Sequence, residues 1–457
     1  MIFDIYIKYI VSFFHYSKNG IILIYNYLKK GGQNMSYKAI KTKLYLSQNE
    51  KKFLLFLMHE AKNLYNQALY NVRQHYFDTG QYLDYVENYK LLKDNTHYRT
   101  LSTSLAQSVI RKVDEAMKAF FGSIKSKKSK KVKLPRYLDK DAYYSLVDRM
   151  VYKANNHEYT LPRGKFIKRL SKQFEEISNK LIKKNLFLSE IESLTLKIET
   201  PKCITNKKIK EITIKEKYDG KYIEAIHVYE DDEEKENDDS MKTETMGIDF
   251  GYNNLAMCAL TNGHHLLIDG LRLKSMNQRY WKKISRLASL RENQQILTKR
   301  MIGLMEKRNN QMTYGINKAA KLMIEHAKKE KVKEIIIGYN EGFKDIKSNK
   351  RNHQWFKAIP IARLRDRIIL LAKANDIECQ VINEAYTSKA SFIDKDDFNQ
   401  IDYSGKRIKR GLYQSKKGTL INADLNASLN IIRKCKPKAL GTGFKGWNTP
   451  KRTYLFS

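Results

Sequence analysis

The stretch TMGIDFGYNNLA, residues 245–256, places a single carboxylate inside a short apolar run. Asp249 stands between two glycines there, and a carboxylate within a strand carries a desolvation penalty unless a metal ion or a cation pairs with it. The apolar runs 256–260 and 264–268 follow and flank an Asn262-Gly263 turn signal, so they predict a β-hairpin. The sequence therefore predicts three consecutive strands with an acid on the first.

The chain is 457 residues long and strongly basic, with 86 Lys and Arg residues against 49 Asp and Glu and a formal net charge of +37. This length allows two or three domains with sizeable cores. A positive excess of this size indicates a polyanionic partner, for which nucleic acid is the default. Codon bias in an A/T-rich genome is an alternative source of the many Lys and of the 30 Tyr residues, but it does not explain the low number of acids.

The four cysteines, Cys203, Cys258, Cys379 and Cys435, are scattered along the chain and form no Cys-x-x-Cys pair. This spacing matches neither a zinc ribbon nor a disulfide framework. We therefore expect the thiols to be reduced, as in a cytoplasmic protein.

Residues 1–34 are apolar and aromatic, unlike the basic remainder of the chain. The apolar run after Gly20 is shorter than the roughly 20 residues of a membrane span, and no signal-peptidase site follows it. A GGAGG ribosome-binding site can encode Gly31-Gly32, so we expect translation to start at Met35 and the leader to be absent from the protein. A membrane anchor is the alternative, and intact-mass analysis of natively expressed protein distinguishes the two.

The N-terminal half predicts strands interrupted by helices. A strand is expected at 37–46, and Ser47-Gln48-Asn49-Glu50 then supplies a capping box for a first helix. A second helix begins at about Ser102. The apolar stripes of the two helices are expected to be buried: Leu54, Leu57, Ala61, Leu64 and Ala68 in the first, and Leu105, Val109, Val113, Met117 and Phe120 in the second.

Two charged runs divide this half further. The lysine-rich run 123–137 is either a solvated linker or a loop that contacts phosphates. Residues 209–217 and 221–228 predict a strand pair around Asp219-Gly220. The acidic run 230–239 then marks the sharpest change of composition in the chain and predicts an exposed linker.

The C-terminal half continues the three strands with alternating helices and strands. Helices are expected at 276–307, 314–331, 360–375 and 422–434, and short strands at 334–338 and 377–382. The order β-β-β-α-α-β-α-β-loop-α is an RNase H-like arrangement with a helical insertion. The predicted fold class is thus an α+β multidomain protein with an RNase H-like α/β domain at its C-terminal end.

Three acids are candidates for metal ligation, because phosphodiester cleavage by two Mg²⁺ ions needs several converging oxygen ligands. Asp249 is the first, with an ion pair to a lysine as the alternative interpretation. Asp424 lies in the first turn of the last helix, where it could equally be a favourable charge at a helix N-terminus. Glu384 follows the strand 377–382, and an exposed loop glutamate is its alternative. Glu384 reaches the site of Asp249 if the two strands are neighbours.

Four segments give the chain a family resemblance: GIDFGYNNLA (247–256), IIIGYNEGF (335–343), NEAYTSKASFID (383–394) and GKRIKRGLYQSKKGTLINADLNASLNIIRK (405–434). They resemble the RuvC segments of TnpB, the transposon-encoded RNA-guided DNA nucleases related to type V CRISPR effectors. The resemblance covers nearly everything after Met35, although it is looser in the N-terminal half.

The resemblance implies a domain order. It consists of a leader at 1–34, a WED-like β-barrel-like domain at 35–46 plus 136–229, a REC-like helical insertion at 47–135, an acidic linker at 230–244 and a RuvC-like nuclease domain at 245–457. The nuclease domain includes a degenerate zinc-ribbon loop at about 385–420.

The chain departs from the family in two places. Ala390 stands where relatives have a cysteine and no Cys-x-x-Cys follows, so no zinc is expected. Gly338 stands where most members carry the middle catalytic glutamate. The GYN form resembles a subgroup in which this glutamate has moved to just before YTSK, which implies Glu384. Glu341 is the competing candidate, and Glu384 is favoured because a strand end fixes a ligand better than a loop does.

The function implied is Mg²⁺-dependent cleavage of double-stranded target DNA, directed by a guide RNA from the transposon end. Asp249, Glu384 and Asp424 are the implied ligands of Mg²⁺, or of Mn²⁺ in its place, and the setting is the cytoplasm and nucleoid of a bacterium. No membrane partner is expected. The alternatives are a nuclease-inactive RNA-guided repressor and, disfavoured by the long N-terminal half, a resolvase or strand-transfer transposase. Aromatic side chains of that half are candidates for stacking on unpaired bases, but the sequence does not select them.

Overall fold

The computed structural model divides into two compact units, residues 1–233 and 234–457. It describes residues 14–17, 20–25, 36–125, 133–149, 158–162, 164, 194–218, 220–231, 241–251, 253–291, 297–340, 359–440 and 449–456. Glu341, most of the predicted leader and acidic linker, and residues 126–132 of the lysine run lie outside these residues. Among the helices in the described ranges, none is long and apolar enough to cross a membrane.

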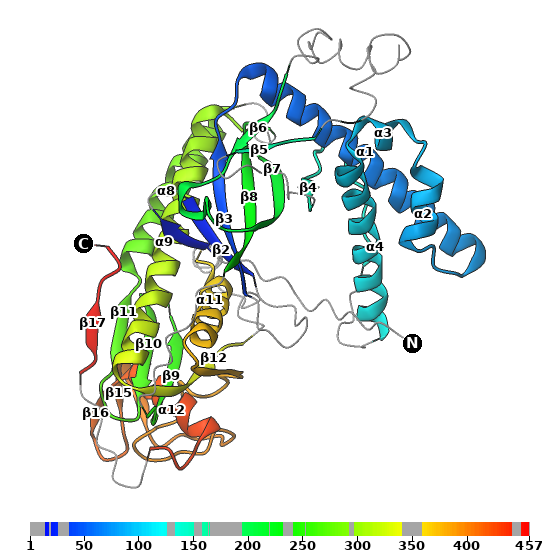
Figure 1. Ribbon diagram of the computed structural model, residues 1–457. Coiled ribbons are helices and arrows are strands. Elements are labelled where there is room, and N and C mark those ends of the chain that lie inside the picture. The colour runs from blue at the N-terminus through cyan, green and yellow to red at the C-terminus, as the bar shows by residue number, and fades with distance from the viewer. Residues whose placement is uncertain are drawn as a thin grey trace. The chain divides into compact units, whose positions relative to one another are not determined.

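The first unit is built on a six-stranded antiparallel sheet with the order β1-β2-β3-β8-β7-β4 (Figure 1). Its strands are β1 (Phe14–Ser17), β2 (Gly20–Tyr25), β3 (Ser36–Leu44), β8 (Tyr222–Asp231), β7 (Ile209–Lys217) and β4 (Leu146–Asp148). The predicted strand pair β7–β8 is confirmed, with Gly220 at φ 71° in its turn. A barrel-like domain is not confirmed, because β1 and β4 are the two edges and no pairing between them exists in the described part.

The described part of the first unit also contains the helices α1 (Gln48–Thr79), α2 (Tyr85–Leu92), α3 (Thr96–Thr100) and α4 (Thr103–Lys125). It also has a small pair of strands, β5 (Glu158–Thr160) and β6 (Lys197–Glu199), and a 3₁₀ turn at Lys202–Ile204. The capping box of α1 is confirmed, because Ser47 Oγ accepts from the Glu50 amide at 3.3 Å and Glu50 accepts from the Ser47 amide at 2.7 Å. The two predicted apolar stripes are buried, apart from the half-buried Phe120.

The second unit has a mixed six-stranded sheet with the order β13-β12-β9-β10-β11-β17. Its strands are β13 (Glu378–Ile382), β12 (Val332–Gly338), β9 (Glu244–Phe250), β10 (Asn254–Leu260), β11 (Leu266–Asp269) and β17 (Lys451–Thr453). The three predicted antiparallel strands β9, β10 and β11 are confirmed, with Gly263 at φ 85° in the turn. On the other side of β9, β12 and then β13 pair in parallel.

Helices cover both faces of this sheet. On one face, α9 (Lys299–Lys329) and α11 (Ile361–Ala374) share a core with Met246 and Ile248 of β9. On the other face, α12 (Ala423–Cys435) packs against Met257 and Ala259 of β10. Two glycines on this second face let α12 approach: a Cβ on Gly247 would lie 2.5 Å from the Ser428 carbonyl oxygen, and one on Gly338 would lie 2.4 Å from Ile431 Cδ1.

The division between the two long basic helices was predicted wrongly. The structure has α8 (Leu271–Ser289) and then α9, which begins at residue 299, whereas the sequence suggested a break at 308–313. Thr298 caps α9 by accepting from the Met301 amide at 3.1 Å. Gly315 lies inside α9 rather than at its start, because a Cβ there would come within 2.6 Å of Leu273 Cδ2 on α8. This glycine serves close helix packing and does not end a helix.

The predicted loop before α12 contains a small sheet that the sequence did not reveal. It consists of β14 (Lys406–Lys409), β15 (Leu412–Gln414) and β16 (Leu420–Asn422), paired antiparallel in that order. Asparagines of α12 tie the preceding segment to the helix. Asn426 and Asn430 both donate to the Ala390 carbonyl, at 2.9 and 2.7 Å, and Asn430 also donates to that of Thr387.

Candidate active site at one end of the second sheet

Asp249 lies one residue before the end of β9, on the face that α12 covers. Side chains of a strand alternate between faces, so Asp249 shares the face of Gly247, whose Cα hydrogens meet α12. Its cross-strand partner in β10 is Met257. The short side chains at this face bring the start of α12 to the sheet, and the carboxylate is half-buried between them.

Asp424 lies in the first turn of α12, which starts at this same end of the sheet. Asn422 caps the helix, because its Oδ1 accepts from the amides of Asp424 and Leu425 at 3.0 and 3.1 Å. Asn254, at the start of β10, donates to Asp424 Oδ2 at 2.6 Å. Arg407 of β14 lies 3.6 Å from Asp424 Oδ1. The carboxylate is thus oriented from both sides.

Glu384 lies two residues after the end of β13, and β13 is not the neighbour of β9, because β12 lies between them. Ile337 of β12 pairs with Ile248, which brings Gly338 level with Asp249. A Cβ on Gly338 would lie 3.2 Å from the Cβ of Glu384. Gly338 has no side chain at the position of β12 that lies between Asp249 and Glu384. Glu384 lies beside this glycine.

The electrostatic surroundings of Asp249 include the other two acids. Burial raises the pKa of Asp249 well above its usual range, and the charges of Glu384 and Asp424 raise it further. The Arg407 guanidinium lowers the pKa of Asp249 and opposes these effects in part. Burial also raises the pKa of Glu384. The ionised form of Asp249 is thus disfavoured by its two neighbouring acids unless a cation joins them.

The chemistry of these donors fits a hard divalent cation, since Mg²⁺ prefers carboxylate oxygens. Their arrangement is not that of a closed coordination shell: within the described ranges, no group of three or more His, Cys, Asp or Glu side chains is placed to hold a metal ion. Asp424 is turned toward Asn254 and Arg407 instead. Glu341, the competing middle acid, lies outside the described residues, so the choice between it and Glu384 stays a prediction.

Sequence reasoning missed two residues of this site, Asn254 and Arg407. Asn254 belongs to the opening stretch, and an amide so close to the strand acid was the available signal. Arg407 lies in the run GKRIKRG, where four basic residues offered no means of choosing one. The structure identifies Arg407 among these four residues, because the small sheet β14–β16 places it next to Asp424 in the first turn of α12.

Comparison with known proteins gives a family-model match to part of the chain and a similar fold. Residues 226–344 match the model of the family OrfB_IS605, described as a probable transposase. This confirms the family resemblance drawn from the motifs. The matched segment contains Asp249 and Gly338 but ends before Glu384 and Asp424. A comparison with curated proteins gives no match.

The fold is similar to that of Cas12f1 in a cryo-EM structure of its complex with sgRNA and target DNA. The TM-score is 0.56 at 17% identity, over 85% of this chain and 83% of that chain. A CRISPR-Cas12f ternary complex also aligns, over 85% of this chain and 82% of that chain at 16% identity, but its TM-score of 0.34 is too low for an argument. At this identity the first likeness concerns the mixed α+β fold alone.

Proposed function

We propose, on the premise that this chain is a TnpB-like member of the OrfB_IS605 transposase family with a Cas12f-like fold, that it is an RNA-guided DNA endonuclease encoded by an insertion sequence. In this proposal the second unit is an RNase H-like RuvC domain, and the first combines a WED-like sheet with a REC-like helical insertion. A guide RNA from the transposon end pairs with one strand of double-stranded DNA. The protein holds the heteroduplex by shape and charge, for which a net charge of +37 is suited.

One observation carries the nuclease proposal. The half-buried carboxylate of Asp249 lies near the charges of Glu384 and Asp424, and these acids raise its pKa rather than being neutralised by lysines. A basic protein with 86 Lys and Arg residues could easily have supplied a lysine there. Mutually repelling acids at the end of a sheet support a site for cations.

Asp249, Glu384 and Asp424 would hold Mg²⁺, or Mn²⁺ in its place. When bound, the metal ions supply an activated water for attack on the phosphodiester and stabilise the leaving oxygen. Asn254 fixes the rotation of the Asp424 carboxylate through its hydrogen bond. Arg407, whose side chain is 48% exposed, offers a positive charge to a phosphate at the same edge and favours the ionised form of Asp249. The proposed setting is the cytoplasm, at the nucleoid.

A nuclease-inactive RNA-guided repressor is the second candidate, and Gly338 is the observation that favours it. The strand position level with Asp249 carries no carboxylate, and the side chain that lies beside it belongs to another strand. In that case guide-directed binding would persist without cutting. The two candidates differ in one measurable property, cleavage.

Plasmid cleavage by the co-purified ribonucleoprotein in Mg²⁺ tests the proposal. RNA that co-purifies is sequenced first, and a transcript of the transposon end is expected. Asp249→Ala and Glu384→Ala should lower the cleavage rate at least about 100-fold, because several kcal/mol of metal stabilisation is lost. Glu325→Ala is the matched control, since this exposed acid on α9 pairs only with Lys321 among the contacts described.

The outcomes separate the candidates. If the wild-type ribonucleoprotein binds its target without cutting, the repressor is correct. If Glu384→Ala cuts normally while Glu341→Ala does not, cleavage is established but Glu384 is not the middle ligand.

A further inference from the structure

We propose that a hollow on α1, in the first unit, binds an unpaired nucleobase that presents an exocyclic amino group. The hollow has a volume of about 510 Å³ and is lined by Asn63, Asn66, Gln67, Tyr70, His97 and Tyr137. Four of these residues recur at the i, i+3, i+4 and i+7 positions of α1, the spacing of one helix face. That face is polar and aromatic here, whereas a face that packs into a core is apolar.

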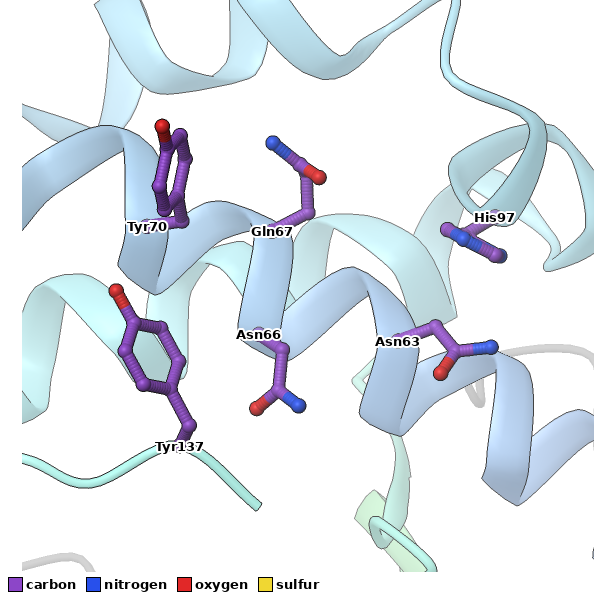
Figure 2. A pocket seen from close by; sticks show the side chains of 6 residues that line it. All are labelled: Asn63, Asn66, Gln67, Tyr70, His97 and Tyr137. Carbon is purple, nitrogen blue, oxygen red and sulfur yellow. The ribbon is translucent and has the colours of Figure 1, made fainter. Parts of the chain in front are cut away.

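The aromatic side chains form one end of the hollow. Figure 2 shows Tyr70 and Tyr137 at this end, Asn63 and His97 at the other, and Gln67 between them. Tyr70 is 50% and Tyr137 42% exposed. Rings this large remain in water at an energetic disadvantage, and a flat aromatic ligand is their natural partner.

Tyr137 is already held in place for such a ligand. Asn66 fixes the following residue with two hydrogen bonds, donating to the Leu138 carbonyl at 2.9 Å and accepting from the Leu138 amide at 2.8 Å. Lys62 donates to the Lys140 carbonyl at 2.8 Å. The Arg73 guanidinium lies 4.9 Å from the centre of the Tyr137 ring and covers one of its faces.

The polar end of the hollow is organised by Glu60, a carboxylate that is 2% exposed. It accepts from Asn63 Nδ2 at 3.3 Å and from His97 Nδ1 at 2.6 Å. These two bonds use a donor of Asn63 and a donor of His97, so the Asn63 carbonyl oxygen and the second His97 nitrogen remain as acceptors among the residues that line the hollow. In the neutral tautomer whose Nδ1 donates to this carboxylate, Nε2 of His97 is an acceptor.

A chain of hydrogen-bonded side-chain amides also fixes the orientation of the Gln67 amide. Its Nε2 donates to Asn71 Oδ1 at 3.2 Å, Asn71 donates to Asn88 at 3.1 Å, and the buried Asn88 donates to the Ala68 carbonyl at 3.0 Å. The chain fixes which end of each amide is the donor. The Gln67 carbonyl oxygen is therefore an acceptor, in addition to the Asn63 carbonyl oxygen and His97 Nε2.

A site with aromatic walls and an acceptor-rich floor matches a base with a donor on its edge. Adenine and cytosine present such an amino group, whereas uracil and thymine present carbonyl oxygens at the corresponding position. In a duplex this edge is paired, so the base must be unpaired. It can belong to RNA or to a displaced DNA strand, and binding there does not require a functional nuclease site.

Fluorescence anisotropy of the full-length chain with labelled 12-nucleotide homopolymers of A, C and U, and of the deoxy forms with T for U, tests this site. Tyr137→Ala should weaken binding of the A oligomer about tenfold, the range of one lost stacking contact. Tyr137→Phe should bind as wild type, which also guards against misfolding of the alanine variant. Tyr45→Ala is the matched control, since Tyr45 is 91% exposed and does not line the hollow.

Gln67→Leu tests the choice of base. It should weaken binding of the A and C oligomers about three- to tenfold and leave the U oligomer unchanged, because one acceptor is lost. A larger loss on RNA than on DNA would assign the base to RNA, and the reverse would assign it to a DNA strand. Equal affinities for Tyr137→Ala, Tyr45→Ala and wild type would overturn the site, and an equal loss for U in Gln67→Leu would overturn the preference for an amino group.

Discussion

The acids at the two ends of the sheet in the second unit differ in their surroundings. At one end, Glu334 of β12 is 5% exposed and is paired with the Lys436 ammonium and the Gln380 amide. At the other end, Asp249 faces Glu384 and Asp424, and only Arg407 compensates in part. The same helix contributes to both ends, with Asp424 in its first turn and Lys436 directly after its last.

The difference distinguishes a structural acid from a functional one. An acid that only stabilises the fold comes with its donors, because an unpaired buried charge is costly. Acids that are buried beside other acids lower the stability of the metal-free protein, and such an arrangement persists when it serves a site. Removing a partner should therefore destabilise the first end, while removing an acid should stabilise the second.

The largest effect is expected at the paired end. Lys436→Met leaves the Glu334 carboxylate without its cation, so the free energy of unfolding should fall by up to about 3 kcal/mol. Glu334→Gln combined with Lys436→Met should recover most of this loss, since no charge is then left buried. Urea unfolding of the single and double variants measures both values. A loss that the double variant does not recover would show that Lys436 stabilises the fold by packing alone.

Gly338→Ala tests the close approach at the other end. The added Cβ would lie 2.4 Å from Ile431 Cδ1 and 3.2 Å from Glu384 Cβ, so we expect a loss of about 2 kcal/mol in stability and slower DNA cleavage. Gly303→Ala is the control: this helical glycine has open space around its Cβ position and should become more stable by about 0.5–1 kcal/mol. A Gly338→Ala variant as stable and active as wild type would refute the steric role.

His227 of β8 is a buried group of the first unit that lacks a partner altogether within the described residues, at either ring nitrogen. Burial lowers its pKa from 6.5 to about 4, so the unfolded chain binds a proton at a higher pH than the folded one. Stability should therefore fall as pH drops below about 6.5, by about 2 kcal/mol between pH 7 and pH 5.

His227→Leu removes this titration and should flatten the pH dependence of urea unfolding over the same interval. An unchanged slope would assign the acid sensitivity to other groups.

The smallest effect concerns Arg407, which is half exposed. Its charge lowers the pKa of Asp249, so Arg407→Gln should raise that pKa and move the acid limb of the cleavage profile to higher pH. Lys409→Gln, on the same strand, is the control and should leave the profile in place. A shift to lower pH in Arg407→Gln would contradict the assigned sign.

Local patterns predicted most elements of both units, because apolar periodicity and turn residues act over a few positions. The capping box at Ser47 and the Asn-Gly hairpin are of this kind. The order of the strands was not predictable in this way, because the sequence did not reveal that β12 separates β13 from β9. The close packing of Gly315 in α9 against Leu273 in α8 was not predictable either. Such outcomes depend on residues that are distant in the sequence.

The acids of the site could be named from the sequence, but their surroundings could not. Asn254, Arg407 and the pairing of Glu334 with Lys436 depend on which strands and helices meet, and no local spacing encodes that. The assignment of Asp249, Glu384 and Asp424 as metal ligands remains a prediction. The structure adds that Gly338, in the strand between β9 and β13, has no side chain that would crowd Glu384.

The unfolding free energy of Asp249→Asn, measured without metal and then in excess Mg²⁺, tests most directly whether these acids form a metal site. Without metal the variant should be more stable than wild type by about 1–2 kcal/mol, because repulsion with Glu384 and Asp424 is relieved. Mg²⁺ should then stabilise wild type and leave the variant unchanged. A variant that is less stable than wild type without metal, and a wild type that does not respond to Mg²⁺, would contradict the account.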